Sequence, residues 1–184
     1  MDPSQFDDED EYVDALRKLW KCKYDYFNEI SSINPNDYSN EDDYCKAIEN
    51  KKNWMNKYDK DNAYKLDLSD YDCEEEYLDD LRACWQDKYD PQHRFNGFEF
   101  ERFTSVDDYL VELNDRLDWI KKCDPEGIFS KIDPSKYDNM FQYQHVLDLR
   151  KAWKKKYDPD NIHNEIDPCD YSSVEEYHEA LMDE

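Results

Sequence analysis

A stretch of sixteen residues recurs six times along the chain, and this tandem repeat constrains the fold more than any other feature. The last copy reads IDPCDYSSVEEYHEAL and runs from Ile166 to Leu181. The others align with it without gaps: MDPSQFDDEDEYVDAL from Met1, INPNDYSNEDDYCKAI from Ile33, LDLSDYDCEEEYLDDL from Leu66, FEFERFTSVDDYLVEL from Phe98 and IDPSKYDNMFQYQHVL from Ile132. The copies start 32 to 34 residues apart. Such a period indicates an array of small supersecondary units.

The repeat predicts that residues 1–184 form a single array in which each module contacts its neighbours. We expect modules at 1–32, 33–65, 66–97, 98–131 and 132–165, followed by a partial module at 166–184. This division leaves no room within the chain for a separate catalytic domain.

Each module is expected to contain one amphipathic helix. Position 12 of every block is Tyr, and a Leu or Ile follows four residues later, which is the spacing of one helix face. A second block continues this pattern: WKCKYD from Trp20, WMNKYD from Trp54, WQDKYD from Trp85, WIKKCD from Trp119 and WKKKYD from Trp153. Pro91, Pro125 and Pro159 follow this block and are predicted to end their helices.

Position 7 of the block predicts the helix N-cap, because its side chains accept hydrogen bonds from the free N–H groups of a helix start. The residues there are Asp7, Ser39, Asp72, Thr104, Asp138 and Ser172. Acids stand three residues later in five modules, and Glu75 and Glu175 are expected to complete capping boxes. The fifth module has Phe141 at that position.

The connectors between helices contain scattered Phe, Ile and Tyr but no helical period. About sixteen helical residues rise roughly 24 Å, a distance that eight or more extended residues can cover. We therefore predict a mainly α fold, a solenoid of one helix plus an extended or irregular return per module. A compact helical bundle is the alternative.

The composition is strongly acidic, with 24 Lys and Arg against 48 Asp and Glu, a formal net charge of −24 and 39% charged residues. The 5 Trp, 16 Tyr and 8 Phe recur at fixed repeat positions and favour a folded chain. There is no signal-peptide pattern and no long apolar run, so a cytoplasmic location is expected. The 6 cysteines occupy different repeat positions and are predicted to be free thiols.

The blocks resemble those of acidic tandem-repeat proteins of gut Firmicutes and their mobile elements, which carry units similar to IDPxDYxTxEEYxxAL. The resemblance covers nearly the whole chain through its six blocks. It implies a repeat fold and a bacterial source, and it assigns no activity and no site.

The motifs of an enzyme are missing. With Gly97 and Gly127 as the 2 glycines, no phosphate-binding loop can be written, and there is no GxSxG elbow. The four histidines are not paired at helical spacing, and the segment from Asp59 lacks the Gly and Glu of a calcium loop. We expect a protein that is not an enzyme and has no cofactor and no metal.

Acids crowd the predicted helix starts, whereas lysines follow each Trp by three residues. We call thirteen of these acids the acidic stripe: Asp8, Glu9, Glu11, Glu41, Asp42, Asp43, Glu74, Glu75, Glu76, Asp107, Asp108, Glu175 and Glu176. Complementation of the helix dipole explains this polarity by itself. A partner-binding surface is the functional alternative.

If the helices stack in parallel about 8–10 Å apart, five modules span roughly 40–50 Å and the acidic starts line one edge. The charge density is then about one per 2 Å, close to the value of about one per 1.7 Å for duplex DNA. This predicts a nucleic-acid mimic that occupies the basic cleft of a nuclease or another nucleic-acid-binding protein. In size and charge it resembles phage and plasmid anti-restriction and anti-CRISPR proteins. Direct binding of nucleic acid is not expected, because the phosphates would be repelled.

A repeat scaffold that binds a protein or peptide through its aromatic residues is the rival hypothesis, with acidity serving solubility. The fifth module also differs from the others, because Lys136, Gln142, Gln144 and His145 replace acids there. It is a candidate docking point or subunit contact, and the sequence leaves the oligomeric state open.

Overall fold

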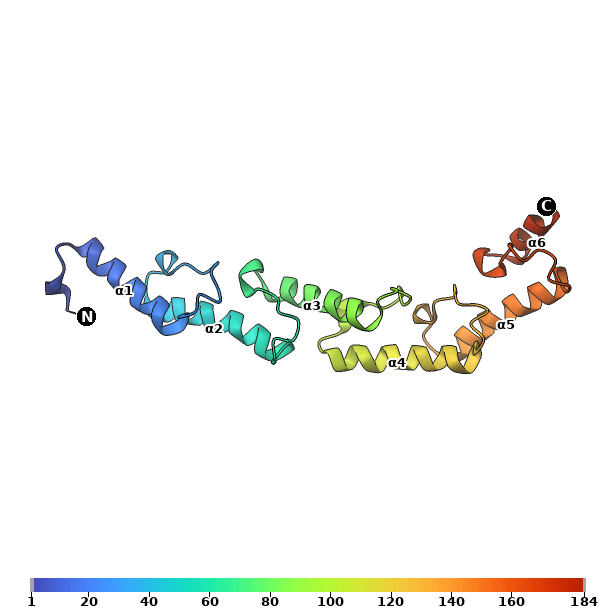
Figure 1. Ribbon diagram of the computed structural model, residues 1–184, viewed down its shortest axis with the longest axis horizontal. Coiled ribbons are helices and arrows are strands. Elements are labelled where there is room, and N and C mark those ends of the chain that lie inside the picture. Colours follow the sequence, from blue (N-terminus) through green and yellow to red (C-terminus); the bar gives the residue numbers. More distant parts are fainter. Residues whose placement is uncertain (1, 184) are drawn as a thin grey trace. The chain divides into compact units, whose positions relative to one another are not determined.

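The computed structural model describes residues 2–183, and this part of the chain contains α-helices and short 3₁₀ helices but no strands (Figure 1). The α-helices are α1 (Glu9–Tyr24), α2 (Glu41–Tyr58), α3 (Glu74–Tyr89), α4 (Val106–Cys123), α5 (Met140–Tyr157) and α6 (Val174–Met182). A three-residue 3₁₀ helix precedes each: Pro3–Gln5, Pro35–Asp37, Leu68–Asp70, Phe100–Arg102, Pro134–Lys136 and Pro168–Asp170. The predicted mainly α class with one long helix per module is confirmed.

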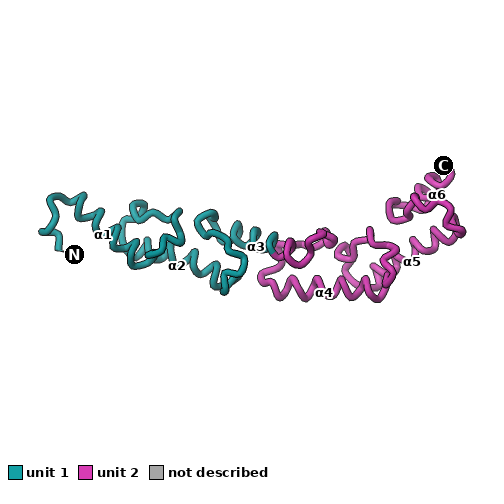
Figure 2. Tube along the Cα trace, viewed as in Figure 1, with its two compact units in different colours: residues 1–84 teal, residues 85–184 magenta. Residues whose placement is uncertain are grey.

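The chain divides into two compact units (Figure 2), of residues 1–84 and 85–184. The division falls within α3. Unit 1 contains α1, α2 and the first part of α3, and unit 2 contains the end of α3 together with α4, α5 and α6. In each unit a helix packs against the next helix in sequence. It also packs against the 3₁₀ helix that directly precedes that next helix.

The predicted N-caps are wrong by one residue. The capping side chains are those of position 8, where Asp8, Asn40, Ser105, Asn139 and Ser173 accept the N–H of the residue three places later. The residue at position 7 instead donates its backbone N–H to a side chain in the first turn of the helix. The four recorded pairs are Asp7 with Glu11, Asp72 with Glu76, Asp138 with Gln142 and Ser172 with Glu176, at 2.9 to 3.2 Å.

The reciprocal bond therefore falls to Glu76 and Glu176 rather than to Glu75 and Glu175. An aromatic contact accounts for the shift. The ring at position 6 packs on the Tyr at position 12 in all six modules, with centroids 5.3 to 5.9 Å apart. This contact works as a hydrophobic staple and fixes where the extended chain enters the helix.

Each long helix ends at an aspartate that directs the following turn. These C-cap or post-helical residues are Asp25, Asp59, Asp90, Asp124 and Asp158, and all five are buried. Asp25, Asp59 and Asp124 each accept two backbone N–H groups, whereas Asp90 and Asp158 are each recorded with one. In Asp124 the Oδ1 accepts the N–H of Ile128 at 3.0 Å and the Oδ2 that of Phe129 at 2.8 Å. A carboxylate with two backbone donors has its charge compensated inside the protein, which lets the chain reverse without unpaired N–H groups.

The third residue after each of these aspartates has a positive φ angle. The residues and angles are Asn28 at 55°, Asn62 at 47°, His93 at 48°, Gly127 at 66° and Asn161 at 53°. Glycine and asparagine are the residues that enter this left-handed region most readily. The pattern Asp-x-x-Asn/Gly is therefore the sequence signal of this turn, and His93 departs from it.

The core of each unit is a series of junctions between consecutive helices. The Tyr at position 12 lies in the first turn of its helix and is fully buried in modules two to six. The Trp of the preceding helix faces it in four recorded pairs: Trp20 with Tyr44, Trp54 with Tyr77, Trp119 with Tyr143 and Trp153 with Tyr177, with ring centroids 6.4 to 6.5 Å apart. The aromatic residues therefore hold neighbouring modules together.

This pairing offsets consecutive helices along their axes. Trp20 is the twelfth residue of α1, whereas Tyr44 is the fourth of α2, so the two helices overlap by their ends, as Figure 1 shows for unit 1. A difference of eight residues corresponds to about 12 Å of helix. The end of one helix thus lies beside the start of the next, rather than the two starts lying side by side.

Candidate functional site

The acidic stripe begins at these junctions, where basic helix ends meet acidic helix starts. In unit 1 the Lys23 Nζ lies 2.8 Å from the Glu41 Oε1, and the Tyr24 hydroxyl donates to the same oxygen at 3.0 Å. The next junction repeats this arrangement with Lys57, Tyr58 and Glu74, at 2.8 and 2.7 Å. The hydrogen bonds from lysine hold the pKa of both glutamates below the usual range. These groups are exposed, so each ion pair adds little stability.

The predicted separation of acidic and basic edges is therefore wrong at these two junctions. Because helices are offset by about 12 Å along the axis and about 8–10 Å across it, each module advances roughly 15 Å. The net charge of −24 over five and a half modules amounts to about four per module. Within a unit the density therefore becomes about one charge per 4 Å, about half that of duplex DNA.

Much of the stripe has a local structural task. Glu11, Glu76, Asp108 and Glu176 bond to groups at their own helix starts, and Asn40 donates to Asp43. Asp8 is itself an N-cap, and Glu75 pairs with the buried Arg82 at 2.9 Å. Helix capping and junction contacts thus explain why acids occur at these positions.

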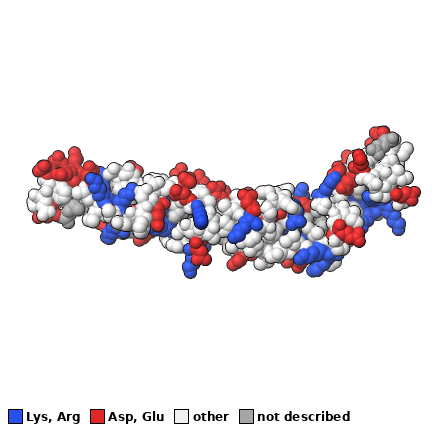
Figure 3. All heavy atoms as spheres, viewed as in Figure 1, with Lys and Arg blue, Asp and Glu red and all other residues white. Residues whose placement is uncertain are grey.

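Four acids of the stripe remain exposed without a recorded ion pair or hydrogen bond in residues 2–183. They are Glu9, Asp42, Asp107 and Glu175, one at the start of each of α1, α2, α4 and α6. We call them the free helix-start acids. Figure 3 shows how acidic atoms gather over the start of α1 and how lysine and arginine atoms gather at the end of α5. These four side chains are the part of the stripe that is available to a partner.

A basic residue stands three places before each Trp and was missed by the sequence analysis. The residues are Arg17, Lys51, Arg82, Arg116 and Arg150. Lys51, Arg82 and Arg116 are buried, and Arg17 and Arg150 are half-buried. Lys51 donates to the Leu68 carbonyl at 3.0 Å, and Arg150 donates to the Tyr171 carbonyl at 2.9 Å. The guanidinium groups of Arg116 and Arg150 also lie 3.9 and 3.8 Å from the ring centroids of Trp119 and Trp153. Their constant spacing from Trp is the signal that could have identified them.

Burial affects the ionisation of these junctions. Lys51 lies among junction residues, and burial lowers its pKa, although Asp72 and Asp67 act in the opposite direction. Burial also raises the pKa of Tyr77 and of Tyr109 to about 12, with a further contribution from Asp59 and Asp90 respectively. The hydroxyls of Tyr44, Tyr77, Tyr109 and Tyr177 are buried and form no recorded hydrogen bond. The junctions are therefore packed mainly through ring contacts.

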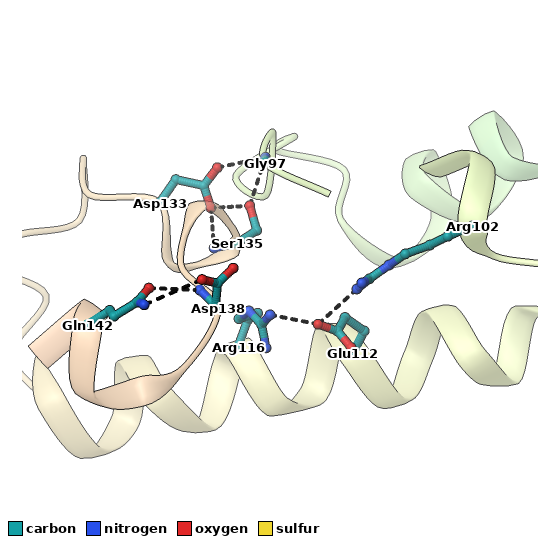
Figure 4. A network of polar contacts seen from close by, with 8 residues as sticks. All are labelled: Gly97, Arg102, Glu112, Arg116, Asp133, Ser135, Asp138 and Gln142. Atoms are coloured by element: carbon teal, nitrogen blue, oxygen red, sulfur yellow. Dashed lines mark hydrogen bonds and ion pairs between the residues drawn. The ribbon is translucent and has the colours of Figure 1, made fainter. Parts of the chain in front are cut away.

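A polar network in unit 2 joins two connectors above α4 (Figure 4). The Gly97 N–H donates to Asp133 Oδ2 at 3.1 Å and to Ser135 Oγ at 2.8 Å. Beside it, Glu112 accepts Arg102 at 2.9 Å and Arg116 at 2.6 Å. Gly97 is required here, because an added Cβ would lie 2.7 Å from Lys136.

This network borders a cleft of about 370 Å³. Its charged lining consists of Arg102, Arg116 and Lys136 against Glu99, Glu112 and Asp138. The three acids and three bases give the lining a formal charge of zero. The contacts join modules, and within them the Ser135 hydroxyl donates to Asp133 Oδ1 at 2.5 Å.

The described residues contain no group of three or more His, Cys, Asp or Glu side chains placed to hold a metal ion. The six cysteines are free, and Cys123 is the buried one. No helix in residues 2–183 has the length and apolar character needed to cross a membrane. Comparison with protein-family models, curated proteins and solved structures finds no match to the chain.

Proposed function

We propose that this chain is a non-enzymatic acidic binding protein that occupies a basic cleft of a nuclease or another nucleic-acid-binding protein. Its mode of action would be that of a nucleic-acid mimic, as in anti-CRISPR and anti-restriction inhibitors, acting in the cytoplasm. The observation that carries the proposal is the exposure of the free helix-start acids, which neither cap a helix nor pair with a lysine.

The presence of net negative charge in both compact units supports this proposal, although its density along a module is about half that of duplex DNA. Residues 1–84 hold 24 acids and 11 Lys and Arg, whereas residues 85–184 hold 24 acids and 13 Lys and Arg, so the net charges are −13 and −11. Acidity is thus present in both compact units. An extended negative potential speeds association with basic surfaces and makes affinity depend on salt.

Burial of the aromatic residues weighs against the rival scaffold hypothesis. Tyr44, Tyr77, Tyr109, Tyr143 and Tyr177 are buried, and each is in contact with another aromatic ring of its own unit. A partner could reach them only by opening a junction. The acids that the junctions leave exposed require no such opening.

The test compares two variants that remove the same number of charges from different places. In the first, Glu9→Gln, Asp42→Asn, Asp107→Asn and Glu175→Gln neutralise the free helix-start acids. In the matched control, Asp61→Asn, Glu126→Gln, Asp160→Asn and Glu165→Gln neutralise four exposed acids of the connectors. Both sets leave the recorded caps and junction ion pairs intact.

Each tagged protein is incubated with a bacterial lysate at low salt, eluted in steps of increasing salt, and the eluate is identified by mass spectrometry. We expect the parent chain to retain a nucleic-acid-binding protein that added DNA or RNA releases. The helix-start variant should lose it at lower salt than the connector control does. Equal loss in both variants would show that the total charge, and not the position of the helix-start acids, determines binding. Capture of a salt-resistant partner without a nucleic-acid role would refute the mimic.

A further inference from the structure

Helix α5 has a charge opposite to that of the protein. It contains five Lys and Arg and one Asp, a net charge of +4, within a chain of net charge −24. Lys154, Lys155 and Lys156 form its last turn. At the junctions of unit 1 the corresponding lysines are neutralised by Glu41 and Glu74, but the equivalent position at the start of α6 is Val174. The end of α5 therefore lacks the glutamate that closes the earlier junctions.

The exposed face of α5 also differs from that of α4 at equivalent positions, which lie 34 residues apart. In α4 this face consists of Asp107, Asp108, Val111, Asn114, Asp115, Asp118, Lys121 and Lys122. In α5 it consists of Phe141, Gln142, His145, Asp148, Leu149, Ala152, Lys155 and Lys156. The α4 face thus holds four acids and the α5 face holds one. The Phe141 side chain on the α5 face is 81% exposed.

The two faces complement each other. The acids of α4 begin in its first turn, whereas the lysines of α5 lie in its last turn. An antiparallel pairing would thus place Asp107 opposite Lys156, Val111 opposite Ala152 and Asp118 opposite His145. Antiparallel helices also bring opposite ends of their dipoles together. Every residue that makes up these two faces is exposed.

We propose that α4 and α5 of one copy pair antiparallel with α5 and α4 of a second copy of this chain. In this dimer Asp107 pairs with Lys156, and Glu9, Asp42 and Glu175 remain as the free helix-start acids. In a twofold dimer each complementary contact forms twice, because the same surface is used by both copies. The exposed Phe141 and Leu149, together with Val111, become the apolar part of this interface, which gives a reason for their exposure in a strongly hydrophilic chain.

The expected interface is small. An eighteen-residue helix is about 27 Å long and presents a face about 10 Å wide. Two such faces on each copy bury roughly 1,100 Å² in total, at the lower limit for specific complexes. The dimer should therefore dissociate in the micromolar range, and repulsion between two highly acidic copies should weaken it further at low ionic strength.

Sedimentation velocity of the full chain from about 5 to 500 μM, at low and at physiological salt, measures the association. We expect a monomer–dimer equilibrium, and Phe141→Ser, which removes the exposed aromatic ring without adding a charge opposite Lys122, should raise the dissociation constant at least tenfold. Ile162→Ser changes another exposed apolar residue, in a connector, and serves as the control. It should leave the constant within about twofold.

A charge exchange tests the pairing itself. Asp107→Lys and Lys156→Glu should each weaken the dimer several-fold, and the double variant should recover most of the loss. Circular dichroism verifies that each variant is folded. A parent chain that is monomeric at 500 μM, or a dimer that the exchange does not restore, would overturn the proposal. Binding of a short RNA duplex that is lost in Lys156→Glu would assign the face to a polyanion instead and would also overturn it.

Discussion

The strongest test of the fold concerns the buried aspartates after each helix, and Asp124 provides the clearest case. Its two carboxylate oxygens accept the N–H groups of Ile128 and Phe129 at 3.0 and 2.8 Å, and the residue is 4% exposed. Asp124→Ala removes both acceptors and leaves two N–H groups, one of them recorded as buried, without their partner. Since each unpaired buried group costs about 1–3 kcal/mol, the free energy of unfolding should fall by about 3–5 kcal/mol.

Asp124→Asn separates hydrogen bonding from burial. The amide keeps one oxygen acceptor but turns an NH₂ group toward the second backbone N–H, so we expect an intermediate loss of about 1–3 kcal/mol. Asp115→Ala, an exposed aspartate on the same helix, is the matched control and should change stability by less than about 0.5 kcal/mol.

Urea unfolding followed by circular dichroism and by tryptophan fluorescence measures these differences, and agreement of the two probes tests for a single transition. If Asp124→Ala costs no more than Asp115→Ala, the carboxylate does not hold the turn. The shared role inferred for Asp25, Asp59, Asp90 and Asp158 would then be wrong as well.

Three further substitutions test separate parts of the structure by the same assay. His93 has a φ angle of 48°, so His93→Gly should stabilise the chain by about 0.5–1 kcal/mol, whereas destabilisation would refute the strain at this turn. Gly97→Ala should destabilise it by about 1–3 kcal/mol, because the new Cβ would lie 2.7 Å from Lys136, and an unchanged stability would show that the connectors separate freely. Tyr109→Phe removes a buried hydroxyl without a recorded partner and should be neutral or stabilising by up to about 1 kcal/mol at pH 7, so a large loss would reveal a hydrogen bond. The raised pKa of Tyr109, about 12, means that its contribution is complete below pH 10 and is lost as the pH rises from about 10 to 12; Tyr109→Phe should therefore reduce the alkaline decline in stability.

The sequence by itself determined the repeat, the number and approximate bounds of the helices, and the role of aromatic residues as core. The helical periodicity and the block at Trp lie within each helix and are visible in its own sequence. The apolar face of a helix must be buried, and this holds without knowing which element covers it. The helix starts were misplaced by one residue because positions 7 and 8 both carry capping side chains in most modules. The contact between the rings at positions 6 and 12, such as that of Tyr71 with Tyr77, decides between them.

Only the tertiary structure decided how one module meets the next. The sequence left parallel stacking open because a helix length and a connector length are compatible with several offsets. The packing of Trp20 on Tyr44 sets the offset and brings Lys23 to Glu41, which moves part of the acidic stripe from a candidate surface into the junctions. The buried aspartates and the basic residues before Trp were visible as repeated letters, but their burial follows from the contact between modules. From sequence alone, a charged residue on a helix is expected to be exposed. It can be buried only when a neighbouring module supplies hydrogen-bond partners for it.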